Sequence, residues 1–126
     1  MRLLIIDHDA HFRTTARALF AAFGHGAVEA RAVAFVAGPL QRGLFDLVVT
    51  QLHDRALTVA VIMAIRAHTS IPLLFIGRRG APEIPDEFAG LAESIIAPFS
   101  IDGLPDRIAA LMIRHHELAR LHAALR

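Results

Sequence analysis

The sequence predicts an α/β domain in which five parallel strands form one doubly wound sheet of the (βα)5 flavodoxin-like type. Short apolar runs of strand length alternate with segments whose apolar residues recur at helical spacing. The runs lack polar alternation, as expected of strands covered on both faces, and parallel strands need crossover connections that are usually helices. With 126 residues, 55% of them hydrophobic, the chain suits one such domain and is too apolar to be disordered.

The beginning of the chain has the pattern of a buried strand followed by a helix. Leu3–Ile6 is a continuous apolar run that ends at Asp7. Apolar residues then recur at helical spacing from Phe12 to Phe23. Because glycine favours the conformation that ends a helix, we expect this helix to end over residues 24–26.

The middle of the chain contains two further pairs of a strand and a helix. Residues 27–31 are assigned to the second strand mainly from their position. The helical pattern of residues 33–40 is expected to be interrupted or ended near Gly38-Pro39. Leu47–Val49 is the third strand, because it is rich in β-branched residues, and residues 56–68 are helical.

The alternation continues after residue 70. Pro72 opens a fourth strand over residues 73–76, where a missing backbone amide is tolerated at the first position. Many helix breakers over residues 77–92 predict a loop and a short helix over about 85–89. Residues 93–96 form the fifth strand, and a long final helix follows.

The composition excludes several classes of site. All 13 basic residues are arginine, and the chain has no lysine, asparagine or cysteine. A lysine Schiff base, a phosphate-loop lysine, a disulfide and a zinc–thiolate site are therefore excluded. The net charge is +1 with interspersed charges, so we expect no nucleic-acid surface. No apolar run approaches the length of a membrane span, and a cytoplasmic location is expected.

Four segments carry a resemblance to a known family. They read Leu-Leu-Ile-Ile-Asp-His-Asp (3–9), Phe-Asp-Leu-Val-Val-Thr-Gln (45–51), Ile-Pro-Leu-Leu-Phe-Ile-Gly (71–77) and Gly-Leu-Ala-Glu-Ser-Ile-Ile-Ala-Pro-Phe (90–99). In this order and spacing they resemble the CheY-like receiver domain of response regulators in two-component signalling. The resemblance covers residues 2 to about 120, and it implies the same fold.

The resemblance also implies a phosphorylation site, whose groups have mostly changed in this chain. The family binds Mg²⁺ with a pair of acids after the first strand, and here that pair is Asp7 and His8. The family phosphorylates an aspartate after the third strand, and here that position is Gln51. An amide cannot form an acyl phosphate and supplies no negative charge for a hard cation. The family's phosphoryl-binding hydroxyl, aromatic switch residue and lysine correspond to Gly77, Ser94 and Ala97.

Two other interpretations stay open. Asp54, three residues past Gln51, could be a displaced phosphoacceptor, whereas Asp46 begins its strand and would lie at the wrong end of the sheet. The second interpretation is a flavodoxin-like module that binds a small anion or a nucleotide. This interpretation is disfavoured because no glycine-rich phosphate loop follows the first strand.

Histidines and acids gather near the predicted site. Asp7, His8, Asp9 and His11, with His53 across the pocket, could suggest a transition-metal site. However, the chain contains eight histidines, so chance proximity is the simpler explanation. We therefore expect no metal site and no cofactor, Mg²⁺ included.

Three loop arginines, Arg55, Arg78 and Arg79, should project at the same end of the sheet. They could hold an anion, or one of them could pair with Asp7, beside Asp9, in place of the missing lysine and metal. The alternative is that they are solvated loop residues that contribute little individually.

The final helix, about 100–124, carries a regular seam. A cap from Ser100 or Asp102 is expected to begin the helix. The first half should pack on the sheet, and the second half, from about His115, should either self-associate or lead into another domain. A single surface helix is the simpler alternative. Seven residues at alternating steps of four and three form the predicted dimer interface: Leu104, Ile108, Leu111, His115, Leu118, His122 and Leu125.

The sequence thus predicts one receiver-like domain over residues 1–126 that works without phosphorylation and is not an enzyme. It would act in signal transduction by contact with a protein partner or an output domain, and as a homodimer. We expect neither direct nucleic-acid binding nor membrane contact. The N-terminal regulatory domain of a transcriptional regulator is one such context, with the output domain beginning after about residue 126.

Overall fold

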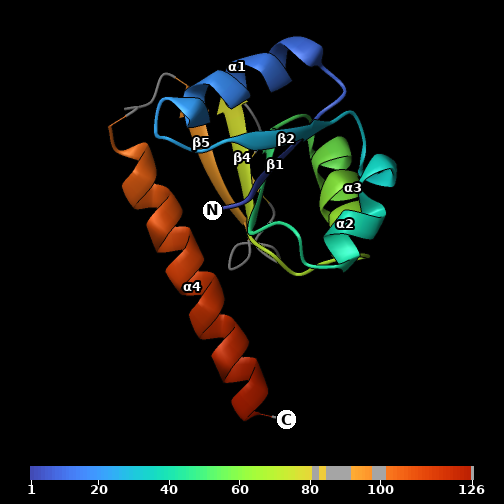
Figure 1. Ribbon diagram of the computed structural model, residues 1–126, viewed down its shortest axis with the longest axis vertical. Coiled ribbons are helices and arrows are strands. Elements are labelled where there is room, and N and C mark those ends of the chain that lie inside the picture. The colour runs from blue at the N-terminus through green and yellow to red at the C-terminus, as the bar shows by residue number, and fades with distance from the viewer. Residues whose placement is uncertain (81–82, 85–91, 98–101, 126) are drawn as a thin grey trace.

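The computed structural model describes residues 1–80, 83–84, 92–97 and 102–125. Five parallel strands form one sheet in the order β2-β1-β3-β4-β5 (Figure 1). This is the doubly wound, flavodoxin-like order that the sequence predicted. The strands are β1 (Leu3–Ile6), β2 (Ala27–Ala30), β3 (Leu47–Gln51), β4 (Leu73–Arg78) and β5 (Ala92–Ala97).

Helices follow the strands as expected, with ends shifted by a few residues. The expected short helix over about 85–89 lies outside the described residues. No helix in the described ranges is both long and apolar enough to cross a membrane. The helices are α1 (Ala10–Ala21), α2 (Ala37–Gln41), α3 (Arg55–Arg66) and α4 (Leu104–Ala124), with a 3-10 turn at Val33–Phe35.

The helical pattern of residues 33–40 is broken at Val36 and not at Gly38-Pro39. Val36 has φ −128° and ψ 14°, which lies outside the helical region, and it separates the 3-10 turn from α2. Pro39 lies in the first turn of α2. Backbone amides there have no partner within the helix, so the proline is tolerated.

The start of α4 also differs from the prediction. The helix begins at Leu104, and its N-cap is Gly103 without a side-chain cap, so the expected cap from Asp102 is wrong. Pro105 stands in the first turn, where its fixed φ favours a helix start and its missing amide leaves no hydrogen bond unmade. Ser100, the other expected cap, lies outside the described residues.

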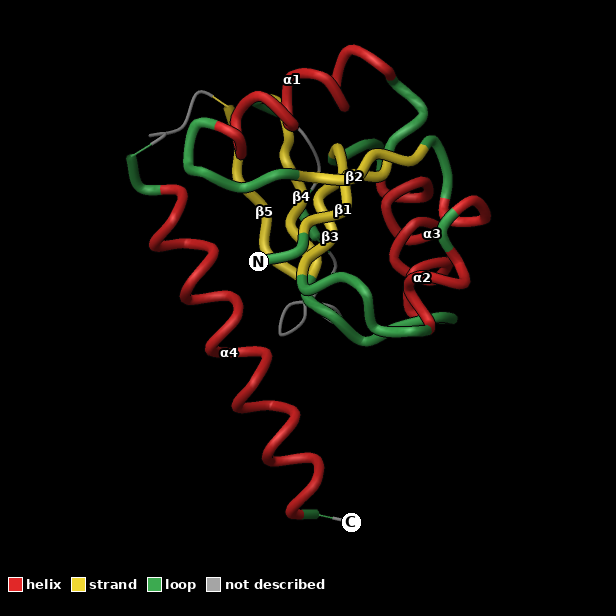
Figure 2. The backbone as a smooth tube through the Cα atoms, in the orientation of Figure 1, coloured by secondary structure: helices red, strands yellow, loops and turns green. Residues whose placement is uncertain are grey.

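Helices cover both faces of the sheet (Figure 2). Side chains alternate along β1, with Leu4 and Ile6 in one apolar cluster and Leu3 and Ile5 in the other. The first cluster includes residues of α2 and α3, and the second includes residues of α1 and α4. Burial on both sides is why this strand has no polar alternation in the sequence.

α4 consists of a packed half and a projecting half. Leu104, Ile108 and Leu111 are buried in the second cluster. These three are therefore core residues of the domain itself, which corrects their assignment to a dimer interface. Beyond them the helix leaves the body of the domain (Figure 1), and exposure reaches 57% at Leu121 and 77% at Leu125.

Glu93 of β5 anchors α4 at the edge of the sheet. Its Oε1 accepts a hydrogen bond from Arg107 at 3.2 Å, and its Oε2 accepts one from Arg114 at 3.1 Å. Arg107 also donates to the backbone carbonyl of Ser94 at 2.8 Å. Because the two arginines are seven residues apart, they lie on the same side of the helix, and one carboxylate holds two turns of it.

The packing of α4 is expected to depend on pH through His115. Burial lowers the pKa of His115 below its ordinary 6.5, and the positive charges of Arg66 and His116 act in the same direction. The folded chain therefore favours the neutral His115 ring. The stabilisation from packing this neutral ring is fully present above about pH 6.5, and it is lost as the pH falls below that value.

We expect the melting temperature, followed by circular dichroism, to fall less steeply with acidification in His115→Leu than in the wild type. His122→Leu, at an exposed position of the same helix, should keep the wild-type slope. Equal slopes in His115→Leu and wild type would contradict this assignment.

Candidate functional site

The residues of the predicted site meet at one edge of the sheet. Asp7 follows β1 directly, and Gln51 is the last residue of β3. Gln51 is in register with Ile76 of β4, next to Gly77. The carboxyl ends of the parallel strands lie at this edge, which is where open α/β sheets place their ligands.

Asp7 is a buried carboxylate, only 5% exposed, whose two oxygens both have partners. Its Oδ1 lies 2.8 Å from Nε2 of His53, in the loop between β3 and α3. Its Oδ2 accepts a hydrogen bond from the backbone amide of Asp9 at 2.9 Å. Because a buried carboxylate without such partners would be costly, these two contacts explain how Asp7 remains in the fold.

A second imidazole lies against this pair. The rings of His8 and His53 are stacked with centroids 5.4 Å apart and an interplanar angle of 24°. Asp7, His8 and His53 each offer one potential ligand atom, and these atoms lie within 4.8 Å of one another. The structure thus brings together three of the five residues that the sequence had grouped and then attributed to chance.

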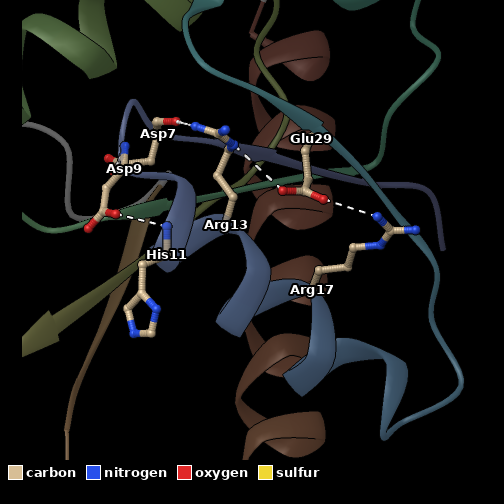
Figure 3. Close-up of polar contacts among 6 residues, drawn as sticks. All are labelled: Asp7, Asp9, His11, Arg13, Arg17 and Glu29. Atoms are coloured by element: carbon tan, nitrogen blue, oxygen red, sulfur yellow. Dashed lines mark hydrogen bonds and ion pairs between the residues drawn. The ribbon is translucent and has the colours of Figure 1, made fainter.

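Of the other two residues of that group, Asp9 has a structural role. Asp9 is the N-cap of α1, and its Oδ1 accepts a hydrogen bond from the backbone amide of His11 at 2.9 Å (Figure 3). His11 is exposed and lies outside the three-residue group.

Arg13 of α1 holds the loop that carries Asp7, a role that the sequence analysis missed. Its Nη1 donates to the backbone carbonyl of Asp7 at 2.7 Å, and its Nε lies 3.6 Å from Oε1 of Glu29 in β2 (Figure 3). Glu29 also pairs with Arg17 at 3.1 Å. The available signal was the position of Arg13 four residues after the N-cap Asp9, which places it one turn above the loop.

The pairing of a loop arginine with Asp7, one of the possibilities that the sequence left open, is not formed. Among the residues that the structure describes, no hydrogen bond or ion pair joins Arg55, Arg78 or Arg79 to this carboxylate, and all three are exposed. His53 occupies that place. An imidazole on the short loop after β3 reaches the buried oxygen directly, whereas Arg55 already belongs to α3.

The remaining positions that the resemblance implied for a phosphorylation site are spread along the same edge. Gln51 is half-buried, and Gly77 is a buried residue inside β4. Ser94 lies in β5, where its carbonyl binds Arg107. Ala97 ends β5 in register with Arg78, and its side chain lies outside the described part of the structure.

Asp54, the alternative phosphoacceptor, is the N-cap of α3. Its Oδ1 accepts a hydrogen bond from the backbone amide of Leu57 at 2.9 Å. A capping role is sufficient to explain an aspartate at this position. Asp46 lies at the opposite end of the sheet, as the sequence predicted, where it pairs with Arg2 at 3.0 Å.

A cleft of about 380 Å³ opens at Asp7, His8 and His53. Most of the rest of its wall is apolar and comes from residues before α2 and from α3, while Arg31 adds a cationic side chain. The site therefore combines one carboxylate and two imidazoles with an opening large enough for a small ligand.

The contact between Arg13 and the Asp7 loop can be tested by substitution. Arg13→Met should lower the free energy of unfolding by about 1.5–3 kcal/mol, because it removes a charged hydrogen bond and an ion pair made by a side chain that is only 14% exposed. The matched control, Arg17→Met, removes a pair in which Arg17 is 63% exposed, so it should cost less than about 1 kcal/mol. Urea denaturation measures both, and equal losses would contradict the bracing role of Arg13.

No family model and no curated protein sequence matches the chain, but solved structures resemble it in fold. The N-terminal domain of a response regulator/sensory box/GGDEF three-domain protein from Carboxydothermus hydrogenoformans has a TM-score of 0.67 and 15% identity, covering 98% of both chains. A CheY-like response regulator receiver domain protein from Methanospirillum hungatei has a TM-score of 0.63 and 18% identity, covering 92% of this chain and 97% of that one.

A third similar structure is that of NtrX from Brucella abortus in complex with ATP. The TM-score is 0.69 with 20% identity, and the match covers 99% of this chain but only 29% of NtrX. Identities of 20% or less show likeness of fold alone. The TM-scores and the coverage show that the chain has the fold of the CheY-like response-regulator receiver domains.

Proposed function

We propose that this chain is a receiver-like signal-transduction module that acts through protein contacts, not as an enzyme, and does not depend on phosphorylation. The observation that supports this most is the position of Gln51 at the carboxyl end of β3. A carboxylate is needed there to form an acyl phosphate, and an amide cannot replace it.

The contacts of Asp7 support the same proposal. Both of its oxygens are engaged, one with His53 and one with the amide of Asp9. Mg²⁺ requires near-octahedral oxygen coordination, whereas the neighbouring side chains here are imidazoles. Among the described residues at this edge, an amide stands at the acceptor position, and the imidazoles beside Asp7 offer nitrogen in place of oxygen ligands.

The projecting half of α4 is the proposed contact surface. His115, Leu118, His122 and Leu125 continue the heptad spacing beyond the domain body, and the exposure of Leu125 leaves it available to a partner helix. We propose that this half pairs with the same segment of a second copy. As the last helix, α4 would also transmit that pairing to an output domain, were one to follow.

Phosphorylation is tested by incubating the chain with acetyl phosphate and Mg²⁺ and then measuring its intact mass. We expect no phosphoryl adduct, because Gln51 cannot accept the group. The matched variant is Asp54→Asn, which removes the alternative acceptor. An adduct that appears in the wild type and disappears in Asp54→Asn would overturn the proposal in favour of a displaced phosphorelay site.

Self-association is tested by light scattering over a range of concentrations. The double change Leu118→Arg and Leu125→Arg should weaken association by about tenfold or more, which corresponds to about 1.4 kcal/mol, because it places charge in the seam. The control is Ile113→Arg, since Ile113 is 60% exposed on another side of α4.

Acidification should also weaken association. Protonation of His115 would place a positive charge at the start of the pairing face, so the mass should decrease as the pH falls from about 8 to about 5.5. A monomer at all concentrations, or an oligomer that resists the double change, would contradict pairing through α4.

A further inference from the structure

We propose that Asp7, His8 and His53 form a binding site for a transition-metal ion such as Zn²⁺. The sequence favoured no metal at this position, since scattered histidines can come together by chance. The structure instead places one carboxylate oxygen and two imidazole nitrogens within 4.8 Å of one another at the mouth of a cleft. This inference does not depend on the proposed signalling function.

The spacing of the three groups is close to that of a tetrahedral site. With metal–ligand bonds of about 2.0–2.2 Å, neighbouring ligand atoms of a tetrahedral ion lie about 3.3–3.6 Å apart. Asp7 Oδ1 and His53 Nε2 are 2.8 Å apart, so an ion would take the place of their hydrogen bond and separate them slightly. His8 is exposed, and its ligand nitrogen already lies within 4.8 Å of the other two ligand atoms.

The surrounding contacts hold the loops that carry the ligands, and an ion would replace only the hydrogen bond between Asp7 Oδ1 and His53. The amide of Asp9 binds Oδ2 of Asp7 at 2.9 Å, which leaves Oδ1 directed toward His53. Arg13 fixes the backbone carbonyl of Asp7 at 2.7 Å, and the hydroxyl of Thr58 donates to the carbonyl of His53 at 3.3 Å. Both loops that carry the ligands are therefore anchored to helices. In metal sites, hydrogen bonds of this kind around the ligands hold them in position.

The donor set selects the class of ion. Imidazole suits Zn²⁺, Co²⁺, Ni²⁺ and Cu²⁺, whereas Mg²⁺ prefers six oxygen ligands. Three protein ligands leave a fourth tetrahedral position, which would face the cleft and take a water molecule. Asp7 neutralises only one of the two charges of the ion. A small anion is therefore also suited to this position, where Arg31 lines the same cleft.

Metal binding is tested on the full chain without an added histidine tag, after treatment with a chelator. Titration with Zn²⁺ in competition with a chromogenic chelator should give one site per chain, and Mg²⁺ should not displace the ion. Co²⁺ should bind with the intense visible absorption of tetrahedral coordination. Zn²⁺ should also raise the melting temperature, because it binds only the folded arrangement of the ligands.

The variants separate this site from adventitious binding to surface histidines. His8→Ala and His53→Ala should each weaken Zn²⁺ binding by more than about tenfold, since the loss of even an outer contact costs that much at metal sites. His11→Ala, in the same loop but outside the group, should bind as the wild type does. His8 is exposed, so its removal leaves the core intact.

Two results would overturn the proposal. One is a wild-type chain that gains no thermal stability from Zn²⁺ and does not compete with the chelator. The other is a His8→Ala or His53→Ala variant that binds Zn²⁺ as tightly as His11→Ala. Neither result bears on phosphorylation or on pairing through α4, so the two proposals fail independently.

Discussion

The burial of β1 and β3 on both faces is the constraint on which the rest of the structure depends. No side chain of β1 is more than 3% exposed, and Leu47, Val48 and Val49 of β3 are fully buried. Helices must therefore cover both faces of the sheet, and the parallel crossovers bring all carboxyl ends to one edge. The position of the candidate site is therefore set by the packing of the strands and not by the identity of the side chains at the edge.

The chemistry at that edge can change because the core does not rely on it. Asp7 is the acid that this chain keeps among the positions implied by the family resemblance, and it is stabilised by His53 and by the amide of Asp9. At two of the other positions, the amide of Gln51 ends β3, and Gly77 precedes the last residue of β4. Two of the three potential ligands beside the cleft are imidazole nitrogens. We therefore propose a transition-metal ion such as Zn²⁺ and not Mg²⁺, the cation that aspartyl phosphorylation requires.

α4 shows how one apolar seam can meet two different surfaces. Its first three apolar positions complete the core above the sheet, and Glu93 clamps the helix there through two arginines. The same spacing then continues into the projecting half, where Leu125 is 77% exposed. Packing on a sheet and pairing with another helix both need an apolar stripe, so periodicity alone could not separate the core residues from the exposed ones.

The sequence by itself determined the number, order and type of the strands and most helices, because burial leaves a local period in the chain. It also placed Asp7, Gln51 and Gly77 at one edge. Only the tertiary structure decided that His53 and not an arginine reaches Asp7, since these two residues are 46 positions apart and their contact depends on the β1–β3 register. Contacts such as this leave no periodic signal, and three-dimensional packing alone brings them together.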